Sequence, residues 1–402
     1  MSDDDEIDWA LTHALRAALV VRRGGTELPR LALDDDTVAR VVSLADESGL
    51  GLLALEGLAA LGTPVVDDLR ARRRDAAVAS LVFDERRRRL SALFERAGVA
   101  HAFFKGALMD PLCFDGSGAR GSTDVDVLVD VRDIERVSAL LVETDGERLT
   151  IPGRAASLSA SHARVFHWRG RGAPVDVDVH VALLDAPPFI DPARDVLARR
   201  VVHATRFGDV VGFSLDDALA YAGAKLVQGG FLDRLKLAVD ASMLLARGAD
   251  VDRALGLART WASTKGLAAL LALVERRLGA PRAGLALARP FASLSSTTRA
   301  ALALVAGLDG APLPPRGVLS RALFAEDAPR GARALARAVV LRSANRVWDV
   351  PVVGLLARAS SEYLSMQSAP RAERSSAHGA APGRATSEGA VVRSRRGEGT
   401  VE

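Results

Sequence analysis

The segment that most constrains the fold of this chain is residues 123–129, where Asp124 and Asp126 begin an apolar run. Side chains alternate between the two faces of a β-strand, so a strand here turns both carboxylates to one face and its valines to the other. Neighbouring carboxylates repel each other unless a bound cation or a shared proton stabilises them. The segment therefore predicts a buried strand that carries a cation site at its beginning.

A second segment of this kind follows at residues 173–183. Its polar side chains are Asp176, Asp178 and His180, which alternate with valines and so share one face of a strand. Taken alone, such a face is most often a solvated surface. A mixed sheet that sets this strand beside residues 123–129 would instead gather three or four carboxylates, an arrangement that would be costly without a divalent metal.

The residues around these strands predict the rest of the sheet. An apolar stretch at 163–168 is separated from the second acidic strand by Gly170-Arg171-Gly172, which favours an antiparallel hairpin.

Carboxylate oxygens with open coordination positions suit Mg²⁺ that carries substrate phosphates, and the chain lacks the Cys or His spacing of a zinc site. We therefore expect a magnesium-dependent reaction of a phosphate-bearing substrate.

Composition excludes several classes of protein. The 402 residues contain a single cysteine, Cys113, so no disulfide forms within the chain. The acidic beginning of the chain and the lack of a long apolar run favour a cytoplasmic protein without a membrane segment. A net charge of only +3 gives no strong nucleic-acid signature.

Apolar spacing and chain breaks divide the sequence into four regions. Residues 1–97 and 211–365 have the periodicity of helices, and residues 98–210 have a mixed strand and helix pattern. Residues 366–402 lack apolar periodicity and are predicted to be disordered. The predicted fold class is α+β, a small mixed sheet with flanking helices between helical N-terminal and C-terminal regions.

Cationic residues stand where a phosphate would need them. Lys105-Gly106 lies between a predicted strand and a predicted helix, where free N–H groups and the helix dipole favour an anion. Lys105 is also one of only four lysines. Arg120 precedes Asp124 beside a glycine-rich loop; the alternative to a phosphate contact is an ion pair with Asp115 or Asp124.

Together these motifs resemble the nucleotidyltransferase superfamily of DNA polymerase β-like enzymes, and within it a branch of uncharacterised bacterial nucleotidyltransferases. The shared pattern is a Lys-Gly turn, then Arg-x-x-x-Asp-x-Asp, then a hydrophobic-Asp-hydrophobic-His strand. A helix with Arg234-Leu235-Lys236 and then Val239-Asp240 also fits. The resemblance covers about residues 95–248, with the motifs in the same order.

The resemblance implies a role for each of these residues. Asp124 and Asp126 would bind two Mg²⁺ ions, and Asp178 would be the third carboxylate, although Asp176 is an alternative. Lys105, Gly106 and Arg120 would bind the triphosphate, and Arg234 and Lys236 lie on a helix near the nucleotide. For Lys236 an ion pair with Asp240, four residues on, is the preferred interpretation. His180 is expected to pack or hydrogen-bond beside the site.

The predicted function is therefore magnesium-dependent transfer of an NMP group from an NTP to an acceptor, with release of pyrophosphate. Two alternatives stay open, a metal-dependent glycosyltransferase that uses Asp-x-Asp and a catalytically inactive binding or regulatory protein with this fold. The sequence identifies neither the nucleotide nor the acceptor, and a small molecule, a protein or an RNA would each be compatible with it.

Overall fold

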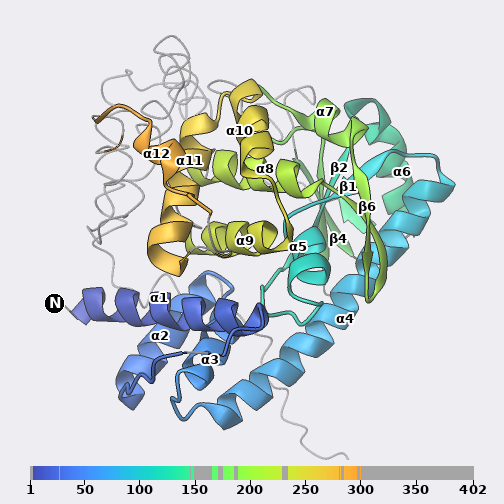
Figure 1. Cartoon of the computed structure of the whole chain (residues 1–402). Coiled ribbons are helices and arrows are strands. Elements are labelled where there is room, and N and C mark those ends of the chain that lie inside the picture. The colour runs from blue at the N-terminus through green and yellow to red at the C-terminus, as the bar shows by residue number, and fades with distance from the viewer. Residues whose placement is uncertain are drawn as a thin grey trace, which may run out of the picture. The chain divides into compact units, whose positions relative to one another are not determined.

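The computed structural model describes residues 3–26, 28–144, 146–148, 165–170, 175–184, 189–228, 234–279, 281, 285–296 and 299 (Figure 1). For residues 3–5, 146–148 and 165–170 it describes the backbone alone. All of these residues belong to one compact unit, Met1–Trp348. The predicted disordered tail and the end of the predicted C-terminal helical region lie outside the described residues, and the division into four regions stays a prediction.

Four helices precede the sheet, as the apolar spacing predicted. They are α1 (Asp3–Arg22), α2 (Asp35–Glu47), α3 (Gly51–Ala60) and α4 (Val66–Arg96). Leucines four residues apart, Leu11, Leu15 and Leu19, form the buried side of α1. Helix α3 packs closely on it at Gly57, where a Cβ atom would stand 1.7 Å from the carbonyl oxygen of Ala14.

The described strands form one mixed sheet in the order β3-β4-β5-β2-β1-β7-β6. Their bounds are β1 His101–Phe103, β2 Asp124–Val129, β3 Gly146–Arg148, β4 Val165–Gly170, β5 Asp176–His180, β6 Val201–Thr205 and β7 Gly208–Gly212. Strands β4 and β5 pair antiparallel, which confirms the predicted pairing of these two segments. The predicted α+β fold class is confirmed.

Strands β2 and β5 are parallel neighbours, and their register decides where the acids lie. Asp124 pairs with Asp176, and Asp126 pairs with Asp178. Val125 and Val127 turn to the opposite face and are fully buried. The two acidic segments therefore share one face of the sheet, as the alternation of side chains predicted.

The α-helices that follow β1 are α5 (Gly106–Cys113), α6 (Ile134–Thr144), α7 (Ala193–Ala198), α8 (Leu215–Gln228), α9 (Arg234–Arg247), α10 (Val251–Thr260), α11 (Thr264–Leu273) and α12 (Arg289–Ala292). Ser214 begins α8 as predicted, because its Oγ accepts from the backbone N–H of Asp217 at 3.1 Å. Helix α5 contacts β2, α4 and α9. None of the described helices has the length and apolar character needed to cross a membrane.

Candidate active site

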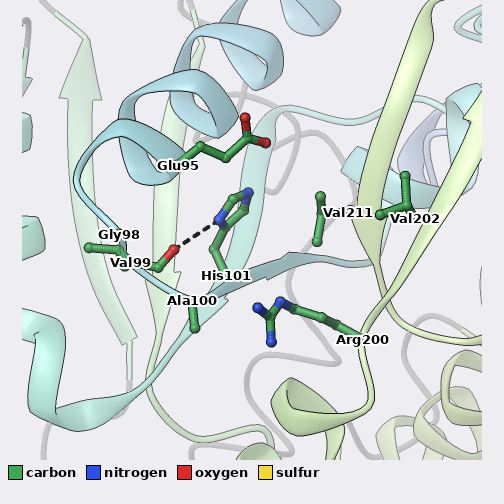
Figure 2. A pocket seen from close by; sticks show the side chains of 8 residues that line it. All are labelled: Glu95, Gly98, Val99, Ala100, His101, Arg200, Val202 and Val211. Atoms are coloured by element: carbon green, nitrogen blue, oxygen red, sulfur yellow. Dashed lines mark hydrogen bonds between the residues drawn. The ribbon is translucent and has the colours of Figure 1, made fainter.

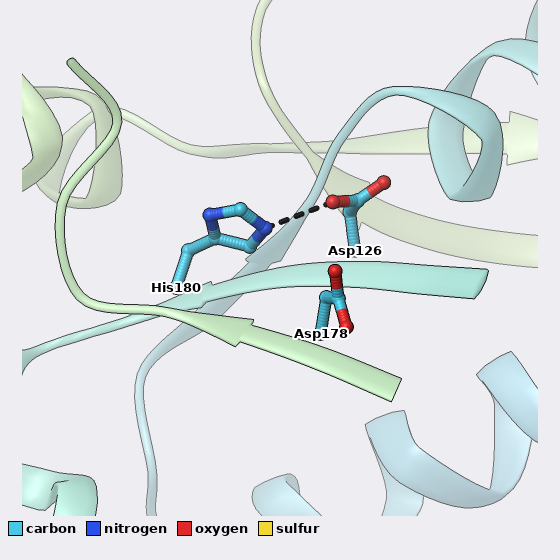
Figure 3. Close-up of side chains that lie close together, drawn as sticks. All are labelled: Asp126, Asp178 and His180. Atoms are coloured by element: carbon cyan, nitrogen blue, oxygen red, sulfur yellow. Dashed lines mark hydrogen bonds and ion pairs between the residues drawn. The ribbon is translucent and has the colours of Figure 1, made fainter. Parts of the chain in front are cut away.

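The polar faces of β2 and β5 meet in a cluster of Asp126, Asp178 and His180 (Figure 3). One carboxylate oxygen from each aspartate and one ring nitrogen of His180 all lie within 4.8 Å of one another. Asp126 comes from β2, and the other two side chains come from the neighbouring β5. Strand pairing therefore brings together residues that are more than fifty positions apart in the sequence.

Asp126 is the most deeply buried acid of the cluster, with 2% of its surface exposed. Its Oδ1 accepts from Lys105 Nζ at 2.6 Å and from His180 Nε2 at 2.8 Å. Burial alone would raise the pKa of Asp126, but Lys105 and His180 outweigh it and lower the pKa to about 2. The Asp126 carboxylate is therefore charged at neutral pH.

The pKa of Asp124 shifts in the opposite direction to that of Asp126. Burial, and then repulsion from Asp126 and Asp178, raises the pKa of Asp124 to about 6. Its side chain is also hydrogen-bonded to that of Asp178. The carboxylates therefore lie close enough together for a proton to be retained near pH 6. This agrees with the mutual repulsion that the acidic strand predicted.

These residues fit a divalent cation. Asp126 and Asp178 offer hard carboxylate oxygens, the ligands that Mg²⁺ prefers. Burial lowers the pKa of His180, so its ring is neutral at pH 7 and Nε2 carries the proton that it donates to Asp126. A histidine that donates to a ligand carboxylate fixes the direction of that ligand. This agrees with the prediction that His180 hydrogen-bonds beside the site.

Lys105 connects the cluster to the beginning of α5. Its backbone has a φ of 49°, which is unfavourable for a residue with a Cβ atom, and residues strained in this way cluster at functional sites. Burial opposes the charge of Lys105, but Tyr221 and Asp126 outweigh it and raise the pKa of the amine. Lys105 therefore stays cationic beside the acids. Its predicted contact with phosphate stays a prediction.

Gly106 lies where the chain approaches the loop before β2. A Cβ atom at this position would stand 1.7 Å from Ser122 Oγ and 3.1 Å from Arg120 Nη1. We expect Gly106→Ala to reduce the free energy of unfolding by about 1–3 kcal/mol, since an added methyl group in a packed site forces its neighbours to move. Urea denaturation measures this change.

The matched control is Gly256→Ala in the interior of α10, where an added Cβ would have no neighbour within 4 Å. This variant should be stabilised by up to about 1 kcal/mol, because alanine is the better helix former. Gly106→Ala with Ser122→Gly should recover part of the lost stability. Equal effects of the two alanine substitutions would contradict the assignment of Gly106 to a close contact.

Arg120 is buried and holds the loop before β2 in place. Its Nε and Nη2 donate to the two oxygens of Asp240 at 2.7 and 2.9 Å, and Nη1 donates to Ser122 Oγ at 2.9 Å. The alternative ion pairs predicted for Arg120, with Asp115 or Asp124, are therefore wrong. The partner is Asp240 on α9, which is 120 positions away in the sequence and lies beside Arg120 only in the tertiary fold. Contact between Arg120 and a triphosphate stays a prediction.

Two further predicted residues also lie on α9. Lys236 Nζ donates to the carbonyl oxygen of Gly121 at 2.7 Å, so Lys236 contacts the same loop as Arg120. Both oxygens of Asp240 accept from Arg120, and the predicted ion pair of Lys236 with Asp240 stays a prediction. Arg234 Nη2 is 4.0 Å from Asp8 Oδ1 of α1. Nucleotide contacts by Lys236 and Arg234 stay predictions.

Sequence reasoning did not single out Ser122 or the role of Asp240. A signal for Asp240 was present, because an aspartate between Val239 and Ala241 in an apolar stretch of helix needs a buried partner. The sequence did not say which cation that partner would be.

A separate cavity of about 590 Å³ lies at the opposite end of β1 from Lys105 (Figure 2). Glu95, His101 and Arg200 line it, with several small apolar residues. His101 Nδ1 donates to the carbonyl oxygen of Val99 at 3.2 Å, and burial lowers the pKa of the ring. None of the acids of the candidate site lines this cavity.

Comparison with known protein families agrees with this geometry. A family model described as "uncharacterised nucleotidyltransferase" matches residues 34–279, more than half of the chain. The matched range contains both acidic strands, the Lys105-Gly106 turn and Asp240. A search of curated proteins gave no match. The chain belongs to this nucleotidyltransferase family.

Proposed function

We propose that the protein is a magnesium-dependent nucleotidyltransferase of the polymerase β-like superfamily, which transfers an NMP group from an NTP to an acceptor hydroxyl. The observation that carries this proposal is the pairing of Asp126 with Asp178 in adjacent parallel strands, with Asp124 on the same face. Family membership supports nucleotidyl transfer over the glycosyltransferase alternative.

The chemistry would use the acids and the cations in separate roles. Asp124, Asp126 and Asp178 would hold two Mg²⁺ ions, which supply charge neutralisation for the triphosphate and activation of the acceptor hydroxyl. Asp178, which is half-buried, would accept the proton of that hydroxyl. The acceptor oxygen bonds to the α-phosphorus while the bond from the α-phosphorus to the pyrophosphate oxygen breaks.

Lys105 and the beginning of α5 would bind the phosphates. The Lys105 side chain is 27% exposed, and its Nζ contacts Asp126 at 2.6 Å. The first N–H groups of α5 have no partners within the helix, and they favour an anion at this end. Gly106 lets the loop with Ser122 pack directly against this end of α5, because a Cβ atom there would stand 1.7 Å from Ser122 Oγ.

The test is a thermal-shift panel of the four NTPs with Mg²⁺ and with EDTA, followed by labelled-NMP transfer to candidate acceptors. We expect at least one NTP to stabilise the protein only with Mg²⁺, by about 2.7 kcal/mol at a concentration of roughly 100 Kd. Stronger stabilisation by a nucleoside diphosphate sugar would favour the glycosyltransferase instead. NTP binding without pyrophosphate release would favour an inactive binding protein.

Two asparagine variants in β5 show in the same transfer assay which aspartate acts as the third carboxylate. Asp178→Asn should remove transfer, because Asp178 pairs with Asp126. Asp176→Asn should retain most of it, because Asp176 is not part of the cluster in which the ligand atoms of Asp126, Asp178 and His180 converge. The reverse result would assign the role to Asp176.

A further inference from the structure

A second cavity, of about 310 Å³, lies at the ends of α5 and α9 that are remote from the acidic cluster. Three arginines line it, and we call it the arginine pocket. Arg22 ends α1, Arg23 follows it, and Arg247 ends α9. The remaining lining residues are Cys113, Asp115, Met243, Ala246 and Pro281. The pocket therefore combines cationic side chains with a partly apolar wall.

Arg23 is the unusual member of this set. Among the residues that the structure describes it has no carboxylate partner, and its side chain donates only to Ser242 Oγ, from Nη1 at 3.3 Å. Burial, and then the nearby positive charge of Arg16, lowers the pKa of Arg23. A half-buried guanidinium without an anion is unfavourable, so the site is incomplete as it stands.

The other two arginines are neutralised to different degrees. Arg22 donates to Glu56 Oε2 from Nε at 2.9 Å and from Nη2 at 2.7 Å, and this pair is largely buried. Arg247 is 3.4 Å from Asp115, and both of these side chains are well exposed. An exposed ion pair of this kind is weak and exchanges readily for another anion. Positive charge thus remains at Arg23 and is available at Arg247.

We propose that the arginine pocket binds a small phosphorylated ligand, with its phosphate held by Arg23 and Arg247 and its apolar part against Met243 and Ala246. A guanidinium group offers paired N–H donors that match two phosphate oxygens. The volume suits a small molecule. This site does not depend on the proposed nucleotidyl transfer, since none of the catalytic acids lines it.

The test is titration calorimetry of the full chain with inorganic pyrophosphate in EDTA, so that no metal can hold the ligand at the acidic cluster. Arg23→Gln should weaken binding at least about tenfold, which corresponds to about 1.4 kcal/mol. Arg247→Gln should weaken it in the same direction. The control Arg74→Gln removes the same charge from an exposed position on α4 and should leave the affinity unchanged.

Three outcomes would overturn the proposal. One is wild-type pyrophosphate affinity in folded Arg23→Gln and Arg247→Gln, which would mean that these arginines only compensate the negative ends of the α1 and α9 dipoles. Loss of binding in Lys105→Gln would place the pyrophosphate at the acidic cluster instead. If citrate binds as tightly as pyrophosphate, the pocket does not select a phosphate group, and the proposed ligand class is wrong.

Discussion

Asp126→Asn is expected to reduce nucleotidyl transfer by at least about 100-fold, since even groups that only orient a metal ligand change metal affinity roughly 10- to 100-fold. Asparagine keeps the shape of the side chain but removes the negative charge that accepts hydrogen bonds from Lys105 and His180. The measurements are labelled-NMP transfer and the Mg²⁺-dependent affinity for the NTP. Both should fall together.

The matched control is Asp130→Asn, just beyond the other end of β2. Asp130 pairs with Arg132, whose side chain is 73% exposed, and it lies outside the acidic cluster. This variant should transfer NMP like the wild type, and circular dichroism should show both variants folded. Wild-type Mg²⁺-dependent NTP affinity in Asp126→Asn would count decisively against the metal site.

Asp240→Asn is expected to lower the free energy of unfolding by about 3–5 kcal/mol, because it leaves the charge of Arg120 buried without an acid. Arg120 and Asp240 are 6% and 4% exposed, and they are joined by two hydrogen bonds. Urea denaturation measures the loss. For comparison, Asp67→Asn removes an acid from the exposed pair with Arg70 and should cost less than about 1 kcal/mol.

A double variant separates the ion pair from the packing around it. Arg120→Met with Asp240→Leu should regain most of the stability lost in Asp240→Asn, because hydrophobic residues of similar volume often replace a buried ion pair without loss. It should still lose NTP affinity, since the Arg120 hydrogen bond to Ser122 beside Gly106 is gone. A double variant as unstable as the single one would contradict this account.

Local sequence pattern was enough to predict the acidic face of the site. Alternation placed Asp124 with Asp126, and Asp178 with His180, because a strand turns every second side chain the same way. Because neighbouring carboxylates repel each other, these segments then required a bound cation or a shared proton to stabilise them. The parallel register of β2 and β5, and the raised pKa of Asp124, agree with that reasoning.

Pattern could not assign partners to side chains that are separated by long stretches of chain. From neighbouring positions alone, Arg120 had Asp115 or Asp124 as its nearest acids, whereas the fold supplies Asp240 from α9. In the same way, Lys105 is next to Asp126 through the antiparallel pairing of β1 and β2. Such contacts depend on how helices pack on the sheet, which a local period does not encode.

By itself, then, the sequence determined which residues share a face and therefore where a cation would bind. Only the tertiary structure decided which cations neutralise which acids, and that Arg23 has no carboxylate partner within the described part of the chain. The physical reason is that side-chain alternation follows from backbone geometry over a few residues. The partner of a buried charge instead depends on segments brought together across the whole chain, as Asp240 and Arg23 show.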